Sequence, residues 1–446
     1  MVDLMVNEQR SSTAGKDVPA GYKLTEVGVI PEDWDCVPFG NLFKTNTKKK
    51  KVSDYELVSF IGMQDVSEDA QLKNNTQLPF KEVKSGFTYF EKGDVLLAKI
   101  TPCFENGKGC HTADLPTNVG FGSTEFHVLR ENEDSDSRFI YFWTTDKKFR
   151  ASLESEMVGS AGHRRVPLVA IEKYLIPCPP NLQEQSAIAD SLSDINNFIL
   201  ALEKLIVKKQ AIKTATMQQL LTGKTRLPQF ALRKDGSAKG YKKSELGAIP
   251  EDWVVTSIGQ FTDCCAGGTP STKISAYWGG THPWMSSGEL HLKQVYAVAD
   301  YITDEGLVNS STKYVPKNSV LVGLAGQGKT RGTVAINRIE LCTNQSIAAI
   351  FPSKHHSTEF LFYNLDSRYE ELRSLSTGDG GRGGLNLTII RKLHLAFPPK
   401  EEQAAIAAIL SDMDKEIQIL QQRLDKTRQL KQGMMQELLT GKIRLI

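Results

Sequence analysis

The sequence predicts an α+β protein in which two tandem mixed α/β domains are joined by two long antiparallel coiled-coil helices. The first observation behind this prediction is a repeat: Gly-Tyr-Lys, followed by Ile-Pro-Glu-Asp-Trp, occupies residues 21–34 and again residues 240–253. The second is a long stretch, from Asn181 to Leu221, without a Gly or Pro that could break a helix, whose apolar spacing returns in the second copy. The third is a set of short β-branched runs separated by Gly, Asn and Pro.

Two further landmarks recur in the same order. A Pro-Pro…Glu-Gln pattern stands at residues 179–185 and 398–403, and Leu-Leu-Thr-Gly-Lys-x-Arg-Leu stands at residues 220–227 and 438–445. This repeat is far longer than the roughly 20–50 residues of a solenoid unit, so it indicates two copies of a domain with its connector. The expected divisions are a polar tail (1–20), a first domain (21–180), a long helix (181–222), a linker (223–239), a second domain (240–399), a second long helix (400–441) and a C-terminal tail (442–446).

Each long helix has a predicted start, stop and seam. Asn181 with Glu184 three residues later resembles a capping box, and Gly223 and Gly441 supply left-handed stops. Apolar residues alternate at spacings of four and three, which is typical of a coiled-coil seam, although two helices packed separately on their own domains are the alternative. The seam residues are Ile188, Leu192, Ile195, Ile199, Leu202, Ile206, Ile406, Leu410, Met413, Ile417, Leu420 and Leu424.

A shared seam has consequences for the whole chain. About 38 residues per helix correspond to ~57 Å. If the second helix runs back along the first, the molecule is pseudo-two-fold and nearly circular, and its end returns to the first domain. Within the domains, strands are expected at residues 56–62, 94–100, 125–129, 319–323, 333–339 and 346–351, and helical stretches at 138–156 and 357–375.

Composition restricts the function classes. The 446 residues include 54 Lys and Arg and 52 Asp and Glu, a formal charge of +2, so any nucleic-acid surface must be local. The seven Cys form no C-x-x-C pair and the eight His are scattered, which predicts neither a disulfide framework nor a metal site. With no bilayer-spanning apolar run and no signal-peptide core in residues 1–20, we expect a cytoplasmic protein without a membrane partner.

One segment imitates a nucleotide site. Residues 323–330 match the P-loop pattern G-x-x-x-x-G-K-[ST], but a P-loop must be followed by a helix. Here an alternating β-branched stretch follows, which favours a hairpin presenting Lys329 and Arg331. The chain also lacks an Asp/Asn-Pro-Pro-aromatic methyltransferase motif, and Leu97 stands where a nuclease triad of Asp94 and Lys99 needs its second carboxylate. No catalytic residue is predicted.

Taken together, the duplicated landmarks closely resemble the specificity (S) subunit of type I restriction–modification enzymes. The resemblance implies a non-catalytic subunit with two target-recognition domains, each reading one half of an asymmetric bipartite site in double-stranded DNA. It further implies a helical pair that sets the spacer, two docked modification (methyltransferase) subunits, and restriction (motor and nuclease) subunits. AdoMet, ATP and Mg²⁺ would belong to these partners, with no cofactor in this chain.

Three alternatives remain at this point: a coiled-coil scaffold without base readout, a P-loop DNA-dependent ATPase, and a fragment of a fused nuclease–methyltransferase. The candidate DNA contacts are basic residues for phosphates and Gln or Ser side chains after an early strand for base edges. The Gly-rich turns at residues 159–165 and 378–384 are interpreted as DNA-contact loops. The alternative is that each is a solvated turn leading into the last strand. The candidates are Lys48, Lys49, Lys50, Lys51, Gln64, Lys99, Lys108, His163, Arg164, Arg165, Ser286, Ser287, Lys329, Arg331 and Arg382.

Overall fold

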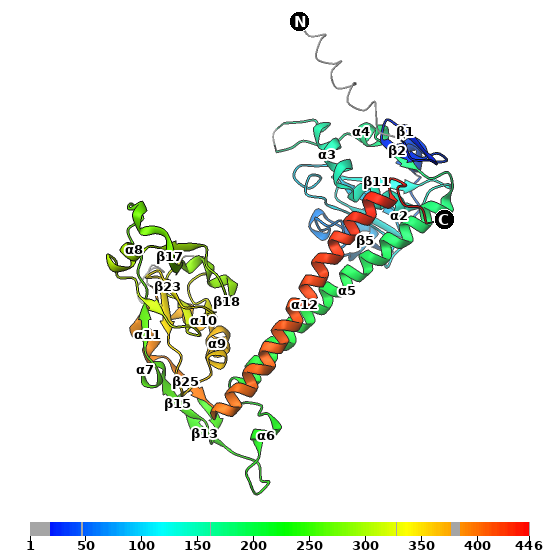
Figure 1. Cartoon of the computed structure of the whole chain (residues 1–446). Helices are drawn as coiled ribbons and strands as arrows, with labels where there is room; N and C mark the ends of the chain where they lie inside the picture. Colours follow the sequence, from blue (N-terminus) through cyan, green and yellow to red (C-terminus); the bar gives the residue numbers. More distant parts are fainter. Residues whose placement is uncertain (1–17, 46–47, 161, 327, 376–383, 446) are drawn as a thin grey trace. The chain divides into compact units, whose positions relative to one another are not determined.

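The computed structural model describes residues 18–445 apart from residues 46–47, 161, 327 and 376–383 (Figure 1). The chain divides into two compact units. The first unit combines the chain up to Glu203 with the chain from Arg423 onward, and the second unit is Lys204–Gln422. Each unit therefore holds one globular domain together with parts of both long helices.

The first domain contains two four-stranded sheets. In one sheet β5 and β10 run parallel and the outer strands are antiparallel to them. The order of strands in this sheet is β6 (Thr76–Pro79), β5 (Leu57–Ile61), β10 (Val119–Gly122) and β7 (Thr88–Glu91). The other sheet is antiparallel, in the order β4 (Phe43–Lys44), β11 (Phe126–Glu131), β8 (Val95–Ala98) and β9 (Gly109–His111).

The second domain repeats this topology. Its four-stranded sheet again has a parallel central pair, in the order β19 (Asp300–Ile302), β17 (Trp278–Met285), β23 (Leu341–Thr343) and β20 (Tyr314–Val315). Its other sheet has one extra edge strand, in the order β16 (Cys264–Ala266), β24 (Ile347–Ile350), β21 (Val320–Gly323), β22 (Val334–Asn337) and β18 (Gln294–Val295). The duplication predicted from the landmarks thus extends to strand order.

Short elements complete each domain. A hairpin opens each one, β1 (Tyr22–Thr25) with β2 (Gly28–Pro31) and β13 (Tyr241–Ser244) with β14 (Gly247–Pro250). The last strand of each pairs with an early one, β12 (Leu175–Cys178) with β3 (Asp35–Pro38) and β25 (His394–Phe397) with β15 (Val254–Ser257). The remaining short helices are η1 (Phe39–Leu42), η2 (Met63–Asp65), α1 (Phe80–Val83), α4 (Leu168–Lys173), α7 (Ile258–Phe261), η3 (Ser275–Tyr277), η4 (Ser287–Leu292), α8 (Asp304–Val308) and α11 (Leu387–Lys392).

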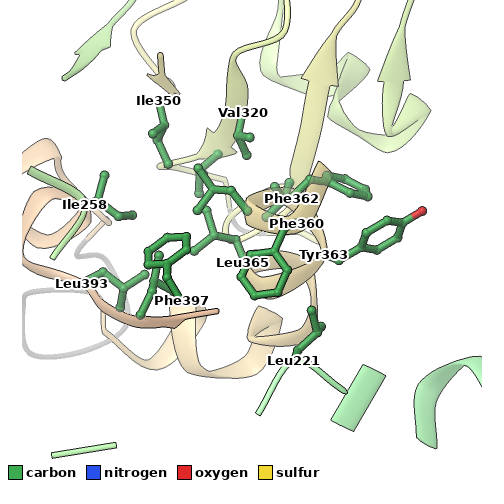
Figure 2. Close-up of a cluster of buried hydrophobic side chains, with 14 of the residues drawn as sticks. Leu221, Ile258, Val320, Ile350, Phe360, Phe362, Tyr363, Leu365, Leu393 and Phe397 are labelled. Atoms are coloured by element: carbon green, nitrogen blue, oxygen red, sulfur yellow. The ribbon is translucent and has the colours of Figure 1, made fainter. Parts of the chain in front are cut away.

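Each domain has its own core, which a helix pair covers. The helices are α2 (Ser137–Thr145) with α3 (Lys147–Ser155), and α9 (Thr358–Ser367) with α10 (Tyr369–Ser374). In the second domain the rings of Phe360 on α9 and Phe397 on β25 lie 5.8 Å apart, surrounded by apolar side chains from β21 and β24 (Figure 2). Leu221, which follows the end of α5, belongs to the same core.

The two predicted continuous stretches at residues 138–156 and 357–375 are each broken in the structure. Asp146 separates α2 from α3 because its carboxylate accepts hydrogen bonds from the backbone N–H groups of Lys148 and Phe149, capping the new helix. Arg368 separates α9 from α10. The predicted linker likewise contains a turn of helix, α6 (Pro228–Ala231).

The long helices α5 (Leu182–Leu220) and α12 (Lys400–Leu438) have 39 residues each. Within the first unit Asn196 pairs with Lys431 and Glu203 with Arg428. Within the second unit Lys209 pairs with Glu416 and Lys213 with Asp414. In both units the residue number of the partner on α12 falls as the residue number on α5 rises. The two helices therefore run antiparallel, as the sequence predicted.

The seam residues have two kinds of surroundings. Ile188 and Leu192 lie in the first domain's core, which also contains Leu438 and Leu439 from the end of the opposite helix. Ile406 and Leu410 lie in the second core, with Met217, Leu220 and Leu221. Ile199, Leu202, Ile206 and Leu424 are buried farther along the helices, whereas Ile195, Met413, Ile417 and Leu420 are half-buried. Each helix therefore begins on its own domain's core and ends in the other domain's core.

Across the described part of the chain, none of the helices combines the length and apolarity that crossing a bilayer requires.

Candidate nucleic-acid interface

The repeated landmarks meet where each domain joins the helix pair. In the first unit Trp34 donates its indole N–H to Glu184 over 3.2 Å, and Arg444 bridges Glu184 and Asp33. The hydrogen bond from Arg444 holds the pKa of Asp33 below its usual range. Since Tyr22 also donates to the carbonyl of Lys442, the C-terminal segment closes onto the first domain, as predicted.

The second unit builds the same junction from the other copy of each landmark. Arg226 donates to Glu402 over 2.7 Å and to Asp252 over 2.8 Å, and Trp253 donates to Glu402. Gly223 stops α5 with a φ of +70°, in the left-handed region that was predicted. These motifs are therefore structural: they fasten the end of each long helix to the domain of the opposite copy.

A β-hairpin occupies corresponding places in the two domains. In the first domain β8 and β9 are joined by residues 99–108, and in the second β21 and β22 are joined by residues 324–333. The first residue of each connection makes matching backbone hydrogen bonds: Lys99 N–H donates to Glu125 and Leu324 N–H donates to Ser346. The two loops differ in sequence but leave their sheets in the same way.

The exit of each Gly-rich turn lies against this hairpin. In the first domain the Val166 N–H donates to the carbonyl of Lys99, and the Thr101 N–H donates to the carbonyl of Arg164. In the second domain the Leu385 N–H donates to the carbonyl of Leu324. The contact-loop hypothesis thus has a geometric basis, because turn and hairpin loop form one surface in the first domain.

Most first-domain candidates gather there. Lys108 donates its ammonium to the carbonyl of Met63 over 2.9 Å, which brings the hairpin loop beside the exposed side chain of Gln64. Arg165 forms a two-pronged pair with Glu125 at 2.8 and 2.9 Å, and Arg164 lies 3.6 Å from Glu105. His163 is exposed in the same turn. The carboxylates of Glu105 and Glu125 were not predicted from the sequence.

The four-lysine run lies elsewhere in the first domain. Lys50 pairs with Glu91 of β7 at 2.5 Å, and the ammonium of Lys49 lies 6.0 Å from the ring centre of Tyr89. Lys48 and Lys51 are exposed. Because β7 belongs to the sheet that does not contain the hairpin, this run stays a separate candidate for phosphate contact.

The second-domain candidates lie around the corresponding hairpin. Ser286 precedes the 3-10 helix η4, and Ser287 begins it. That helix packs on the hairpin: a Cβ built at Gly323 would lie 3.1 Å from the side chain of Leu290. Lys329 is exposed in the loop and Arg331 is half-buried. Arg382 lies outside the described residues.

The P-loop interpretation is contradicted by the strand that follows the motif. Val322 pairs with Val334 across the hairpin, and the Gly323 N–H donates to Thr333. In a P-loop the motif is followed by a helix whose N-terminus holds the phosphates, whereas here it is followed by the strand β22. Across the described residues, His, Cys, Asp and Glu side chains also form no group of three that could hold a metal ion.

Sequence reasoning missed two arginines behind the hairpins. Arg150 on α3 and Arg373 on α10 donate to backbone carbonyls of the two loops. A signal was available, because each Arg directly follows a buried apolar residue, Phe149 or Leu372, on the second helix of the pair that covers its domain's core. That pattern alone also fits an arginine that is exposed on the surface. Only the fold distinguishes such a residue from an arginine that holds loop carbonyls.

Comparisons with known proteins agree with this architecture. Residues 31–214 and 250–429 match the family described as the type I restriction modification DNA specificity domain. The EcoEI specificity subunit of Escherichia coli is 36% identical over 168 residues, covering 37% of this chain and 28% of that protein. The chain therefore spans less than a third of that relative's length in the alignment.

Other similarities extend over nearly the whole chain. The MjaVIII specificity subunit of Methanocaldococcus jannaschii is 25% identical, covering 93% of this chain and 94% of that protein. The crystal structure of the type I restriction-modification system S subunit from M. genitalium superimposes with a TM-score of 0.57 at 14% identity, covering 94% of this chain and 98% of that one. This likeness shows a shared fold. With the family match in both halves, the chain belongs to the type I restriction–modification DNA specificity family.

Proposed function

We propose that this chain is the DNA specificity subunit of a type I restriction–modification complex, a cytoplasmic and non-catalytic subunit whose two domains each read one half of a split DNA site. The observation that carries the proposal is a duplicated scaffold whose two copies have different loop side chains. Strand order, hairpin and helix-end junction are repeated, whereas the loop side chains differ between the copies. Two different readers on one scaffold predict two different half-sites.

The chemistry of the two loop surfaces supports this division of labour. Lys329, Arg164 and the lysine run supply cations for phosphates, which add affinity without sequence information. Gln64 and Ser287 have side chains that hydrogen-bond base edges in the major groove, Gln to adenine and Ser to either base. Replacing Gln64 or Ser287 with Ala should therefore change the recognised bases, and an unchanged motif would remove these two residues as readers.

The helix pair has the length for a spacer. Each helix of 39 residues corresponds to ~58 Å, and DNA-binding dimers place half-sites about 34–36 Å apart. We place two methyltransferase subunits on the assembly, joined by restriction subunits for cleavage. AdoMet, ATP and Mg²⁺ would be bound by those partners.

The decisive experiment is a map of N6-methyladenine in the source genome with and without this gene, using the natural partner subunits. Loss of one split, asymmetric motif on deletion is the expected result, and it would give both half-sites and the spacer. A map that stays the same while the partner subunits are expressed and assembled would reject the proposal.

A further inference from the structure

We infer that Arg150 and Arg373 are positioning residues that set the shape of the DNA-facing hairpin loops by holding their main-chain carbonyls. The inference rests on the proposed function and deepens it, because it names what determines the accuracy of each reader. Neither residue lies among the basic candidates that the sequence suggests. Both donate to main-chain carbonyls of the loop, and Arg150 also lies over the ring of Phe104, 4.9 Å from its centre.

Arg150 is a buried cation held by carbonyl oxygens. Its side chain donates to Phe104 over 2.7 Å, to Gly107 over 3.2 Å and to Lys108 over 3.3 Å, all in the hairpin loop. A fourth hydrogen bond, of 2.6 Å, anchors it to Thr144 at the end of α2. The residue is 7% exposed, so DNA cannot reach the guanidinium without displacing the loop.

Arg373, which is half-buried, holds the main chain of the second hairpin loop. It donates to the carbonyl of Gly328 over 2.8 Å and lies 3.4 Å from that of Arg331, while Tyr369 donates to the carbonyl of Lys329 over 3.1 Å. Arg373 also donates to the Tyr369 hydroxyl and lies over its ring. The carbonyl groups of Gly328, Lys329 and Arg331 are thus held in place. Lys329 and Arg331 carry side chains that are predicted to contact DNA.

The two copies reach this arrangement from different sequences. The loops share no motif, yet an arginine from the second helix of each core-covering pair, α3 or α10, holds the corresponding loop. Arginine suits this task because its planar fork presents five donors, whereas lysine presents one point charge on a flexible stem. Since fixing a carbonyl restricts the neighbouring Cα–Cβ directions, the two guanidinium groups restrict where Lys108 and Arg331 point, and the Tyr369 hydroxyl does so for Lys329.

The test compares Arg373→Gln and Arg150→Gln in the complete complex, reading the methylated motif of each. Matched controls are Arg368→Gln, an arginine that bonds Glu371 and the carbonyl of His394 rather than the loop, and Lys148→Gln, an exposed residue of α3. We expect Arg373→Gln to lower discrimination by tenfold or more at base pairs of one half-site only, about the value of one good base contact. Arg150→Gln should do so in the other half-site.

The half-site read by the unaltered domain is an internal control for assembly and folding. Retention of both half-sites at full stringency in a folded variant would overturn the inference, and so would equal loss of both, which is the signature of general unfolding. Because the buried Arg150 is the riskier site for folding, Arg150→Lys and thermal melting accompany it. Lysine should keep the domain folded and still relax its half-site. Failure of the proposed function differs from all of these, because deleting the gene would then leave the methylation map unchanged.

Discussion

Glu105 and Glu125 partly neutralise the basic turn of the first domain. Arg165 lies in a two-pronged pair with Glu125, and this hydrogen bonding holds the pKa of the glutamate below its usual range, so it stays ionised at neutral pH. A DNA phosphate that binds Arg165 must therefore compete with Glu125. If the turn contacts DNA as proposed, we expect this pairing, together with the formal charge of +2, to limit binding at random sequences.

Glu125→Gln should raise affinity for non-specific duplex DNA. Removing the competing charge makes Arg165 available for one more phosphate, so binding should strengthen by about two- to fivefold. The dependence of log K on log salt should steepen by about one unit. Fluorescence anisotropy of the complex over a salt series measures both quantities, with the exposed Glu154→Gln as control. Weaker binding would instead mean that Glu125 orients Arg165 for its DNA contact.

His356 gives the second domain a specific sensitivity to acid. It is 4% exposed, one ring nitrogen lies 2.8 Å from the Ser353 hydroxyl, and burial lowers its pKa to about 4. The unfolded chain, with a pKa of ~6.5, binds more protons between pH 4 and 6.5. Stability therefore rises with pH through that window and is lost as pH falls.

His356→Phe should remove this loss, which amounts to about 2 kcal/mol between pH 7 and pH 4.5. Urea unfolding of the full chain at the two pH values, followed by a probe in the second domain, measures the difference. The neighbouring His355 is exposed, so His355→Gln should keep the wild-type profile. An identical acid response in wild type and His356→Phe would show that other groups dominate.

Among the secondary-structure elements, the sequence patterns predicted most of what the structure contains. The strand after the P-loop-like motif was predicted because its β-branched residues alternate, and Gly223 was predicted as a helix stop. The break at Asp146 was missed because apolar spacing continues across it, although Asp is one of the residues preferred at a helix N-cap. Ile188 and Ile406 show a further limit of the sequence patterns. The spacing of a seam shows which face of a helix is buried, but it does not show whether the other helix or a domain core covers that face.

The stop of α5 gives a test of backbone geometry. Gly223 has a φ of +70°, and a Cβ there would lie 2.5 Å from the ring of Pro250. Gly223→Ala should cost 3 kcal/mol or more, because the clash adds to the ~1–2 kcal/mol of a left-handed alanine. Gly236 also has positive φ but open space around it, so Gly236→Ala should cost only the backbone part. Chemical denaturation compares them; equal losses would show that Pro250 yields.

For the whole molecule, the main consequence of the duplication is that each domain is completed from far along the chain. Leu220, Leu221 and Arg226 from the end of the first copy belong to the second domain, and Leu438, Leu439 and Arg444 belong to the first. The seam pattern predicted that the chain end returns to the first domain, but landmark matching alone could not assign the helix-end motifs, since identical motifs fit either domain. Removing the end of one copy's long helix should therefore destabilise the domain of the other copy.

Truncation after residue 436 should consequently unfold the first domain, although its own residues 21–180 are intact. The cut removes Leu438 and Leu439, which are 4% and 1% exposed, and each buried leucine contributes about 2–5 kcal/mol. Their sum is comparable to the 5–15 kcal/mol that holds a typical domain together. Hydrogen exchange should show lost protection in residues 21–180 and retained protection in 240–399. A second truncation, after Lys442, keeps both leucines and removes the Arg444 bridge and the Ile443–Glu437 backbone hydrogen bond, so it should weaken the first domain without unfolding it. Equal loss in both domains after either cut would contradict the exchange and indicate a single cooperative unit.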